Sequence, residues 1–341
     1  MTSNENRISP LHGAGGEMMS RLLAEHVLPH FAASQVGRIG LSAMDDGATI
    51  ALPTAGELVM TTDSHVVKPI FFPGGDIGKL AAAGTLNDLA VMGARPLALS
   101  LAVIIEEDFP ISDIDRIVES FAHTLIGSQT PLICGDTKVM GRGEIDGIVI
   151  NTTGLGIANP AISDAGAVPG DVIIVTGSMG DHGMALLAAR EEFHLETELK
   201  SDVDSIWPMI RTILPIGGIH AMKDPTRGGL AAALNEMSGK SGTTIELTQS
   251  AIPIRDEVQA LSDLLGISPL EVANEGKAVL IVDPALADQI LETLQKHPLG
   301  RHAAIIGIVG TKFPGRVVMT TPVGGRRFLD MPLGDPVPRI C

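Results

Sequence analysis

The chain has 341 residues, 45% of them hydrophobic, and its 40 acidic and 24 basic residues give a formal net charge of −16. This length is typical of two domains, and the apolar content excludes a largely disordered chain. The acidic excess argues against nucleic acid or an anionic membrane surface as the main partner, and it is equally well explained by solubility.

The two cysteines, Cys134 and Cys341, cannot form a disulfide framework, which indicates a reducing compartment. The opening MTSNENRISP lacks the basic-then-apolar order of a secretory signal, and no uncharged run reaches the ~20 residues of a membrane span. A prenylation motif would place its cysteine four residues from the end rather than last. We therefore expect a cytoplasmic protein.

The first half of the chain alternates between strand and helix patterns. The glycine-rich HGAGGE comes first, followed by an amphipathic stretch over residues 18–27. Strands are predicted over ELVMTTDSHVV, PLALSLAVII, PLICGDTKVM and IDGIVINTTGLGIA. The nearly uncharged residues 80–94 predict a buried helix, and SDIDRIVESFAHTLIG predicts another, with Ser112 and Asp115 suited to a capping box in its first turn.

A turn-rich junction, ISDAGAVPGD, separates this half from a second one. Strands are predicted over DVIIVTG, KAVLIVD, AAIIGIVG and RVVMTT, and helices over residues 181–192, residues 204–214 and TRGGLAAALNEMSG. The fold class is therefore α/β with two halves of similar size. The expected units are residues 1–42 with the glycine-rich loop, residues 43–160, residues 161–330 and a tail over residues 331–341.

The tail ends in PVPRIC and holds three prolines and a glycine in eleven residues, which predicts a mobile or extended segment. Fully extended it would reach roughly 35 Å. Its last residue, Cys341, is a nucleophile that could therefore enter a site elsewhere on the molecule. Cys134 lies in an apolar strand pattern and is predicted to be an inert core residue.

The usual nucleotide and hydrolase motifs are missing: the sequence has no G-x-x-x-x-G-K-[ST], no G-x-G-x-x-G after a strand, no H-E-x-x-H and no G-x-S-x-G. What it offers instead is a lone Asp88, the only charge between Lys79 and Arg95. A carboxylate in so apolar a helix must be paired, protonated or bound to a cation. A helix cap or a buried salt bridge would explain it equally well.

Other aspartates stand at strand ends or beside glycines. They are Asp45 and Asp46 in MDDGA, Asp63 in TTDSH, Asp136 in CGDTK and Asp224 in DPTRGGL. Each alone is more typical of a turn or an N-cap. Together they suit Mg²⁺ that bridges a triphosphate, with the backbone of HGAGG and PGGD close to the anion.

Longer motifs resemble a known superfamily. FFPGGDIGKLAAAGTLNDLAVMGARP, GDTKV and DPTRGGL resemble aminoimidazole ribonucleotide synthetase, thiamine monophosphate kinase and selenophosphate synthetase. TTDSHVV followed by FFPGGDIGKL, and above all the final PRIC, resemble the HypE family of hydrogenase maturation factors within that superfamily. The resemblance covers nearly the whole chain.

This resemblance implies a two-domain PurM-like fold, in which residues 43–160 bind ATP and form a homodimer. The residues that match ATP-binding and Mg²⁺-binding positions are Asp45 or Asp46, Asp63, Asp88, Asp136 and Asp224. We also expect Gly15 and Gly16 of the glycine-rich loop, and Lys79, to bind the nucleotide. It also implies that Cys341 receives a carbamoyl group from a HypF-type transferase. ATP-dependent dehydration would then yield a thiocyanate, and the cyanide would pass to a HypC–HypD scaffold.

The dehydration needs a base beside the carbamoyl nitrogen. Lys138 in GDTKV and Glu275 in ANEGK match positions associated with this role, and Glu275 is slightly favoured because a neutral lysine requires a large pKa depression. Their alternative roles are a phosphate contact or surface charge for Lys138, and a turn or a pair with Lys277 for Glu275.

Two other functions remain open from the sequence. The first is a small-molecule kinase or synthetase of the same fold, which would keep its ATP turnover without Cys341. The second is a non-catalytic carrier whose terminal thiol docks a metal or a partner. A nucleophile as the last residue favours the dehydratase over both.

Overall fold

The computed structural model describes residues 16–22, 24–25, 37–39, 43–51, 56–190, 198–334, 336–337 and 339–340. Gly15 and Cys341 lie outside these residues. Within them, no helix has the length and apolar character needed to traverse a membrane.

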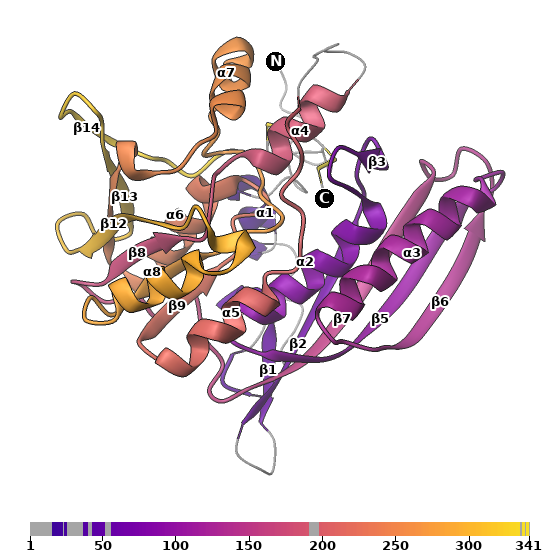
Figure 1. The fold of residues 1–341 in the computed structure, drawn as a ribbon, viewed down its shortest axis with the longest axis horizontal. Coiled ribbons are helices and arrows are strands. Elements are labelled where there is room, and N and C mark those ends of the chain that lie inside the picture. Colours follow the sequence, from indigo (N-terminus) through magenta and orange to yellow (C-terminus); the bar gives the residue numbers. More distant parts are fainter. Residues whose placement is uncertain are drawn as a thin grey trace.

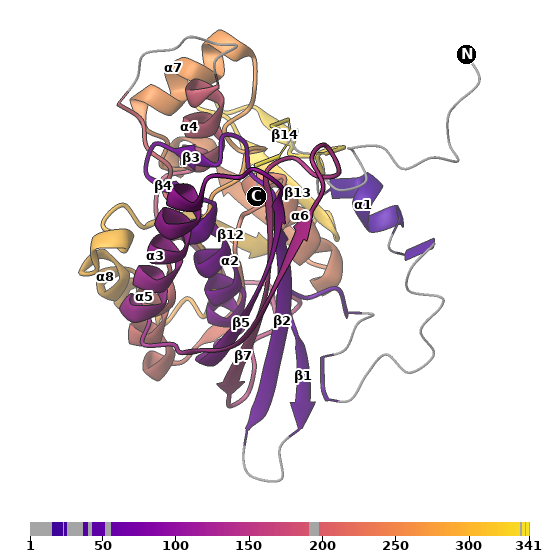
Figure 2. The same cartoon turned by 90° about the vertical axis from the view of Figure 1, so that its right-hand side faces the viewer.

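The N-terminal half forms a five-stranded sheet in the order β1-β2-β7-β5-β6. Its strands are β1 (Ala48–Ala51), β2 (Glu57–His65), β5 (Arg95–Glu106), β6 (Leu132–Met140) and β7 (Ile148–Ala158). Figures 1 and 2 show helices α2 (Ile77–Val91) and α3 (Ile111–Gly127) along one face of this sheet. A short hairpin of β3 (Phe71–Phe72) and β4 (Gly75–Asp76) leads into α2.

The C-terminal half forms a seven-stranded sheet in the order β14-β13-β10-β12-β8-β11-β9. Its strands are β8 (Val172–Val175), β9 (Ile219–Lys223), β10 (Thr244–Thr248), β11 (Val279–Val282), β12 (Ala304–Gly310), β13 (Arg316–Thr320) and β14 (Arg326–Phe328). One face packs on α6 (Gly229–Ser241), and the other on α5 (Trp207–Ile213) and α8 (Ala287–Gln295). The remaining helices are α1 (Gly16–Leu22), α4 (Asp181–Ala189) and α7 (Asp256–Leu265).

The predicted buried helix is confirmed as α2, which joins the two halves. Asp76 caps it by accepting hydrogen bonds from the backbone N–H groups of Gly78 and Lys79 at 2.8 and 3.0 Å. Its apolar side chains enter three cores, one shared with α3, α4 and α7, one shared with α5 and α8, and a third in which Leu89 packs with residues of β2 and β7. Because six of the 15 residues of α2 are glycine or alanine, both domains approach it closely.

Two local expectations differ from the structure. The helix predicted around residues 112–127 is present, but it begins at Ile111 after Pro110 (φ −63°) and no side chain caps it, so the predicted capping box is wrong. Ser112 falls inside the first turn because the helix starts one residue earlier. Cys134 is exposed rather than buried. The reason is that β6 is an edge strand whose side chains are almost all exposed.

Candidate active site between the two domains

Five acidic side chains from both halves face one another. Asp46 precedes β1, Asp63 lies on β2 and Asp88 on α2, whereas Asp224 follows β9 and Glu275 precedes β11. Asp88, Asp224 and Glu275 each have at least two of the other members as close charged neighbours. We call these five residues the acidic cluster, and all five belong to the set predicted from the sequence.

Asp88 reaches the cluster because α2 lies directly on β2. A Cβ atom on Gly84 would lie 2.9 Å from the His65 ring and 3.4 Å from Asp63 Oδ2. Because α2 and β2 are so close, Thr61 on β2 can donate a hydrogen bond of 2.5 Å to Asp88 Oδ2. A larger residue at position 84 would push the helix away from the strand, so the small-residue sequence of α2 is what positions Asp88.

Burial and mutual repulsion raise the pKa values of three cluster members. The pKa of Asp88 stands well above its ordinary value, through burial first and then through Asp63, Asp224 and Asp46. Burial, with Asp46 as the main negative neighbour, raises the pKa of Asp224 to about 7 against the opposing charge of Lys223. The pKa of Glu275 is also raised well above its ordinary value by burial and by Asp224. Carboxyl groups crowded in this way hold protons or require a cation near neutral pH.

The adjacent Asp45 and Asp46 point to different partners. Asp46 accepts a hydrogen bond of 2.5 Å from Lys223 Nζ and is a charged neighbour of Asp88 and Asp224. Asp45 accepts hydrogen bonds from Ser163 Oγ at 2.8 Å and from Lys240 Nζ at 3.1 Å. Of the two, the structure therefore brings Asp46 to the acidic cluster.

Both backbone polar groups of Glu275 are held by hydrogen bonds. Its N–H donates to Asp202 Oδ1 at 3.1 Å, and its carbonyl accepts a hydrogen bond of 2.9 Å from Asn87 Nδ2 on α2. The side chain is only 2% exposed, and Oε1 accepts no hydrogen bond. A buried carboxyl oxygen with no donor is available to a substrate group.

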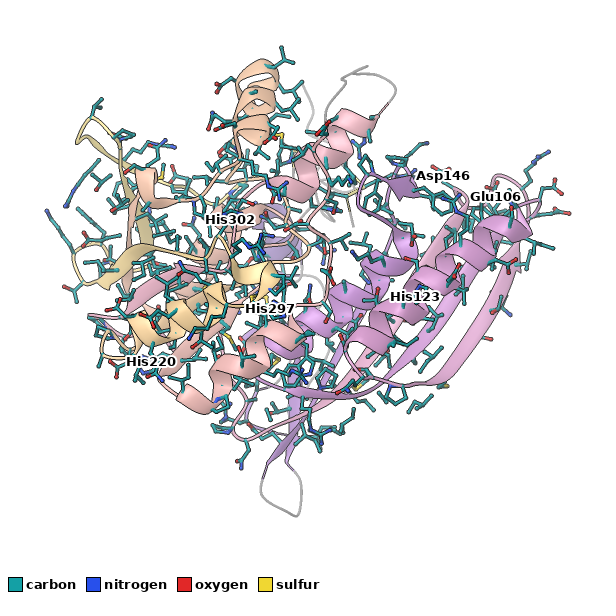
Figure 3. The ribbon with its side chains drawn as sticks, viewed as in Figure 1. Glu106, His123, Asp146, His220, His297 and His302 are labelled. Carbon is teal, nitrogen blue, oxygen red and sulfur yellow. The ribbon has the colours of Figure 1, made fainter. Side chains whose placement is uncertain are left out.

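The described residues of the tail, which the sequence predicts to be mobile or extended, are packed between the two halves. Val337 and Ile340 are 0% and 3% exposed, and the Ile340 carbonyl accepts a hydrogen bond from buried His182 at 2.8 Å. Arg339 pairs with Asp146, which Figure 3 labels near β3. The described part of the tail, up to Ile340, therefore lies between the domains.

Asp136 and Lys138 lie away from the cluster, on the opposite face of the N-terminal sheet. Asp63 pairs with Thr152 on β7, whereas Asp136 pairs with Ala102, which in turn pairs with Asn151. Successive side chains of a strand alternate between faces, so Asp63 and Asp136 point to opposite sides. Lys138, two residues after Asp136, shares its face.

Two other predicted residues also lie outside the cluster. Lys79 Nζ is 3.5 Å from Asp204 Oδ2, across the boundary between the domains. Gly16 (φ +75°) lies against the tail, because a Cβ atom there would approach the Pro332 carbonyl oxygen to 2.2 Å. Neither contact tests a role at the nucleotide, and these two roles stay predictions.

Among the described residues, no group of three or more acidic, histidine or cysteine side chains forms a closed metal site. The acidic cluster nevertheless fits Mg²⁺, which binds to one or two carboxylates and completes its shell with water and substrate phosphates. Burial, and then repulsion by neighbouring carboxylates, raise the pKa values of Asp88 and Asp224, in agreement with an excess of acidic groups there. A divalent cation would relieve that excess.

Two protein families match the chain, each over one half. The AIR synthase related N-terminal domain matches residues 44–158, and the AIR synthase related C-terminal domain matches residues 168–319. A putative hydrogenase expression/formation protein of Methanocaldococcus jannaschii is 50% identical, over 98% of this chain and 100% of its own length. The carbamoyl dehydratase HypE of Cupriavidus necator is 44% identical, over 98% of this chain and 95% of its own. This chain belongs to the HypE family.

Solved HypE structures share its fold. HypE in complex with ATP superposes with a TM-score of 0.81 and 41% identity, covering 97% of this chain and 98% of that one. HypE from a HypE–HypF complex gives a TM-score of 0.84 and 40% identity, covering 91% of this chain and 99% of that one. The expected two-domain PurM-like architecture is confirmed.

Several site residues of this HypE-family chain were not predicted. Thr61, Lys223 and Asp202 contact members of the acidic cluster, and His182 contacts the tail. Thr61 and Lys223 could have been found, because each stands within two residues of a predicted aspartate. His182 and Asp202 carry no sequence signal, since only tertiary packing brings them to the site. Other histidines, among them His123, His220, His297 and His302, are spread over both halves in Figure 3.

Proposed function

We propose that this HypE-family chain is an ATP-dependent carbamoyl dehydratase that converts an S-carbamoyl group on Cys341 into a thiocyanate and supplies the cyanide ligand for [NiFe]-hydrogenase. The observation that carries the proposal is the docked tail. Ile340, one residue before Cys341, is buried against His182, and the segment next to His182 also binds the backbone of Glu275. The names of the relatives support the same activity.

The chemistry requires a phosphoryl donor and a base. Transfer of the γ-phosphoryl group of ATP to the thiocarbamate oxygen converts a poor leaving group into phosphate. Loss of phosphate and of both nitrogen protons then leaves S–C≡N, so that the products are thiocyanate, ADP and phosphate. A nearby cation neutralises charge on the transferring group.

Different members of the acidic cluster would bind the cation and act as the base. Asp46, Asp88 and Asp224 would hold Mg²⁺, which supplies charge neutralisation at the triphosphate, with Asp63 beside them. Glu275 is the better candidate for the base, because its free Oε1 is buried and its pKa is raised, and a raised carboxyl pKa makes a stronger base. Lys138 lies on the other face of the sheet and would require a second subunit to reach the reaction.

A homodimer would use that other face. Ile50 and Met60 on it are 37% and 44% exposed, and the register places them beside Leu58 and Leu155. Pairing two such faces would cover this apolar surface and place Asp136 and Lys138 at the subunit boundary. The remaining partners are a HypF-type transferase, as in the solved HypE–HypF complex, and a HypC–HypD acceptor.

The kinase alternative is tested by Cys341→Ala. With MgATP and an active carbamoyl-transferase system, the dehydratase predicts that ADP release falls to the background rate in this variant. Cys134→Ala is the matched control and should release ADP at the wild-type rate. ADP release by Cys341→Ala on a free small molecule would instead support a kinase.

A further inference from the structure

His182 makes two hydrogen bonds that connect the tail to the body of the protein. It lies at the start of α4 and is 0% exposed. Its Nε2 is 2.8 Å from the carbonyl oxygen of Ile340, and its Nδ1 is 2.7 Å from Ser201 Oγ. Its ring also meets Phe72 edge-on, with the centroids 5.5 Å apart. The imidazole therefore has one fixed orientation.

The partners determine which nitrogen carries the proton. A carbonyl oxygen can only accept, so Nε2 must donate to Ile340. Ser201 Oγ already accepts from the Val203 N–H at 3.0 Å, which leaves its hydroxyl hydrogen to donate to Nδ1. Burial lowers the pKa of His182, in agreement with a neutral ring. Val203, Ser201, His182 and Ile340 thus form one directed chain of hydrogen bonds.

The same loop also holds the base candidate. Ser201 orients His182, and the next residue, Asp202, accepts the backbone N–H of Glu275. Asp202 Oδ2 is 3.5 Å from Lys277 Nζ, so this carboxylate is tied to the Glu275 segment on both sides. A displacement of residues 201–202 would therefore move the tail contact and Glu275 together.

Two further contacts hold the tail at the preceding residue. The Lys68 N–H donates to the Arg339 carbonyl at 3.2 Å, and the Arg339 side chain pairs with Asp146. Both contacts act one residue earlier than Ile340. The Ile340 carbonyl belongs to the peptide that joins Ile340 to Cys341, and it is this carbonyl that His182 binds.

We propose that His182 is a positioning residue, whose Nε2–H fixes the Ile340–Cys341 peptide and so sets where the thiol of Cys341 lies relative to Glu275. This inference rests on the proposed dehydratase, since it assigns His182 to the step that follows carbamoylation. When the bond opens, the tail is held by fewer contacts and its thiol becomes accessible to an outside donor. His182 thereby biases the tail toward the docked arrangement.

Two amide substitutions separate this role from simple packing. In His182→Gln the side-chain N–H lies near the original Nε2 and can still donate to Ile340. In His182→Asn the shorter amide reaches only as far as the original Nδ1, so it keeps a partner for Ser201 and loses Ile340. The readout is the rate at which iodoacetamide labels Cys341 in the full-length protein with MgATP, followed by peptide-resolved mass spectrometry. Exposed Cys134 is labelled in the same sample and normalises the rates for the reactivity of the reagent.

We expect His182→Asn to raise the labelling rate of Cys341 about threefold to tenfold, as for the loss of one hydrogen bond. His182→Gln should stay within about twofold of the wild type, and Cys134 should react at the same rate in all three proteins. Equal Cys341 rates in the three proteins would overturn the proposal. So would an equal increase in His182→Asn and His182→Gln, because the increase would then not depend on the hydrogen bond to Ile340.

Ser201→Ala provides a second route if His182→Asn does not fold. It removes the hydroxyl that sets the ring orientation and should raise Cys341 labelling in the same direction, whereas an unchanged rate would count against the proposal. Labelling requires no carbamoyl chemistry, so the result stands even if the protein proves to be a kinase. Conversely, dehydration with unaltered labelling would overturn only the role of His182.

Discussion

Asn87 Nδ2 on α2 donates a hydrogen bond of 2.9 Å to the backbone carbonyl of Glu275 in the C-terminal half. The same amide donates to the Asp204 carbonyl at 3.1 Å, and its oxygen accepts the Ile206 N–H at 2.9 Å. Asn87 is 1% exposed and directly precedes Asp88. One short stretch of α2 therefore supplies a cluster carboxylate and fixes the loop that carries Glu275.

Asn87→Ala should lower the free energy of unfolding by about 2–3 kcal/mol, because three buried backbone groups lose their partner. It should also reduce dehydration more than it weakens ATP binding, since Glu275 loses its support. Urea denaturation and ATP titration measure the two effects. Asn235→Ala is the control: its amide bonds the carbonyls of Ala231 and Leu329 away from the cluster, so ATP-dependent activity should remain.

Asp46→Asn and Asp45→Asn should change different properties: the first lowers turnover, and the second lowers stability. Asp46→Asn removes a negative group from the acidic cluster and should lower ATP-dependent turnover about 100-fold. Asp45→Asn weakens the pairing with Lys240 and should cost about 1 kcal/mol of stability with nearly normal turnover. Steady-state ADP release and thermal unfolding distinguish them, and the reverse pattern would show that Asp45 is the functional member of the pair.

Asp88→Asn should inactivate the protein without unfolding it. The pKa of Asp88 is raised by burial and by three neighbouring carboxylates, so a neutral amide of the same shape removes repulsion. We expect a melting temperature equal to or above that of the wild type, together with about a 100-fold loss of turnover. A large fall in melting temperature would mean that Asp88 serves the fold instead.

Mg²⁺ binding should strengthen as pH rises through about 7, the value to which the pKa of Asp224 is raised. A raised carboxyl pKa means that the protonated form is favoured in the cation-free protein, so these groups contribute less stability as pH rises. Mg²⁺ competes with those protons. Its stabilisation, read as the upward shift in melting temperature with an ATP analogue, should therefore be larger at pH 8 than at pH 6. Asp224→Asn should flatten this dependence, and a wild-type shift independent of pH would refute the assignment.

Much of the site follows from local sequence. A lone Asp88 in an uncharged helix and an Asp63 at a strand end can both be recognised without a structure, as can a final cysteine. The choice between Asp45 and Asp46 cannot, because adjacent residues in a loop point wherever tertiary partners such as Lys223 and Lys240 hold them. The same holds for Asp136 and Cys134: their strand was predicted, but its place at an edge of the sheet, and thus their exposure, depends on strand order.

Dehydration on Cys341 is measured by the intact mass of the protein, followed by the mass of its C-terminal peptide. The protein is incubated with its carbamoyl-donor system and then with MgATP. We expect one carbamoyl adduct on Cys341, then the loss of one water only when ATP is present, and no such loss in Glu275→Gln. An unmodified Cys341 in the presence of a demonstrably active donor, or an adduct that ATP leaves unchanged, would show that the protein is not this dehydratase.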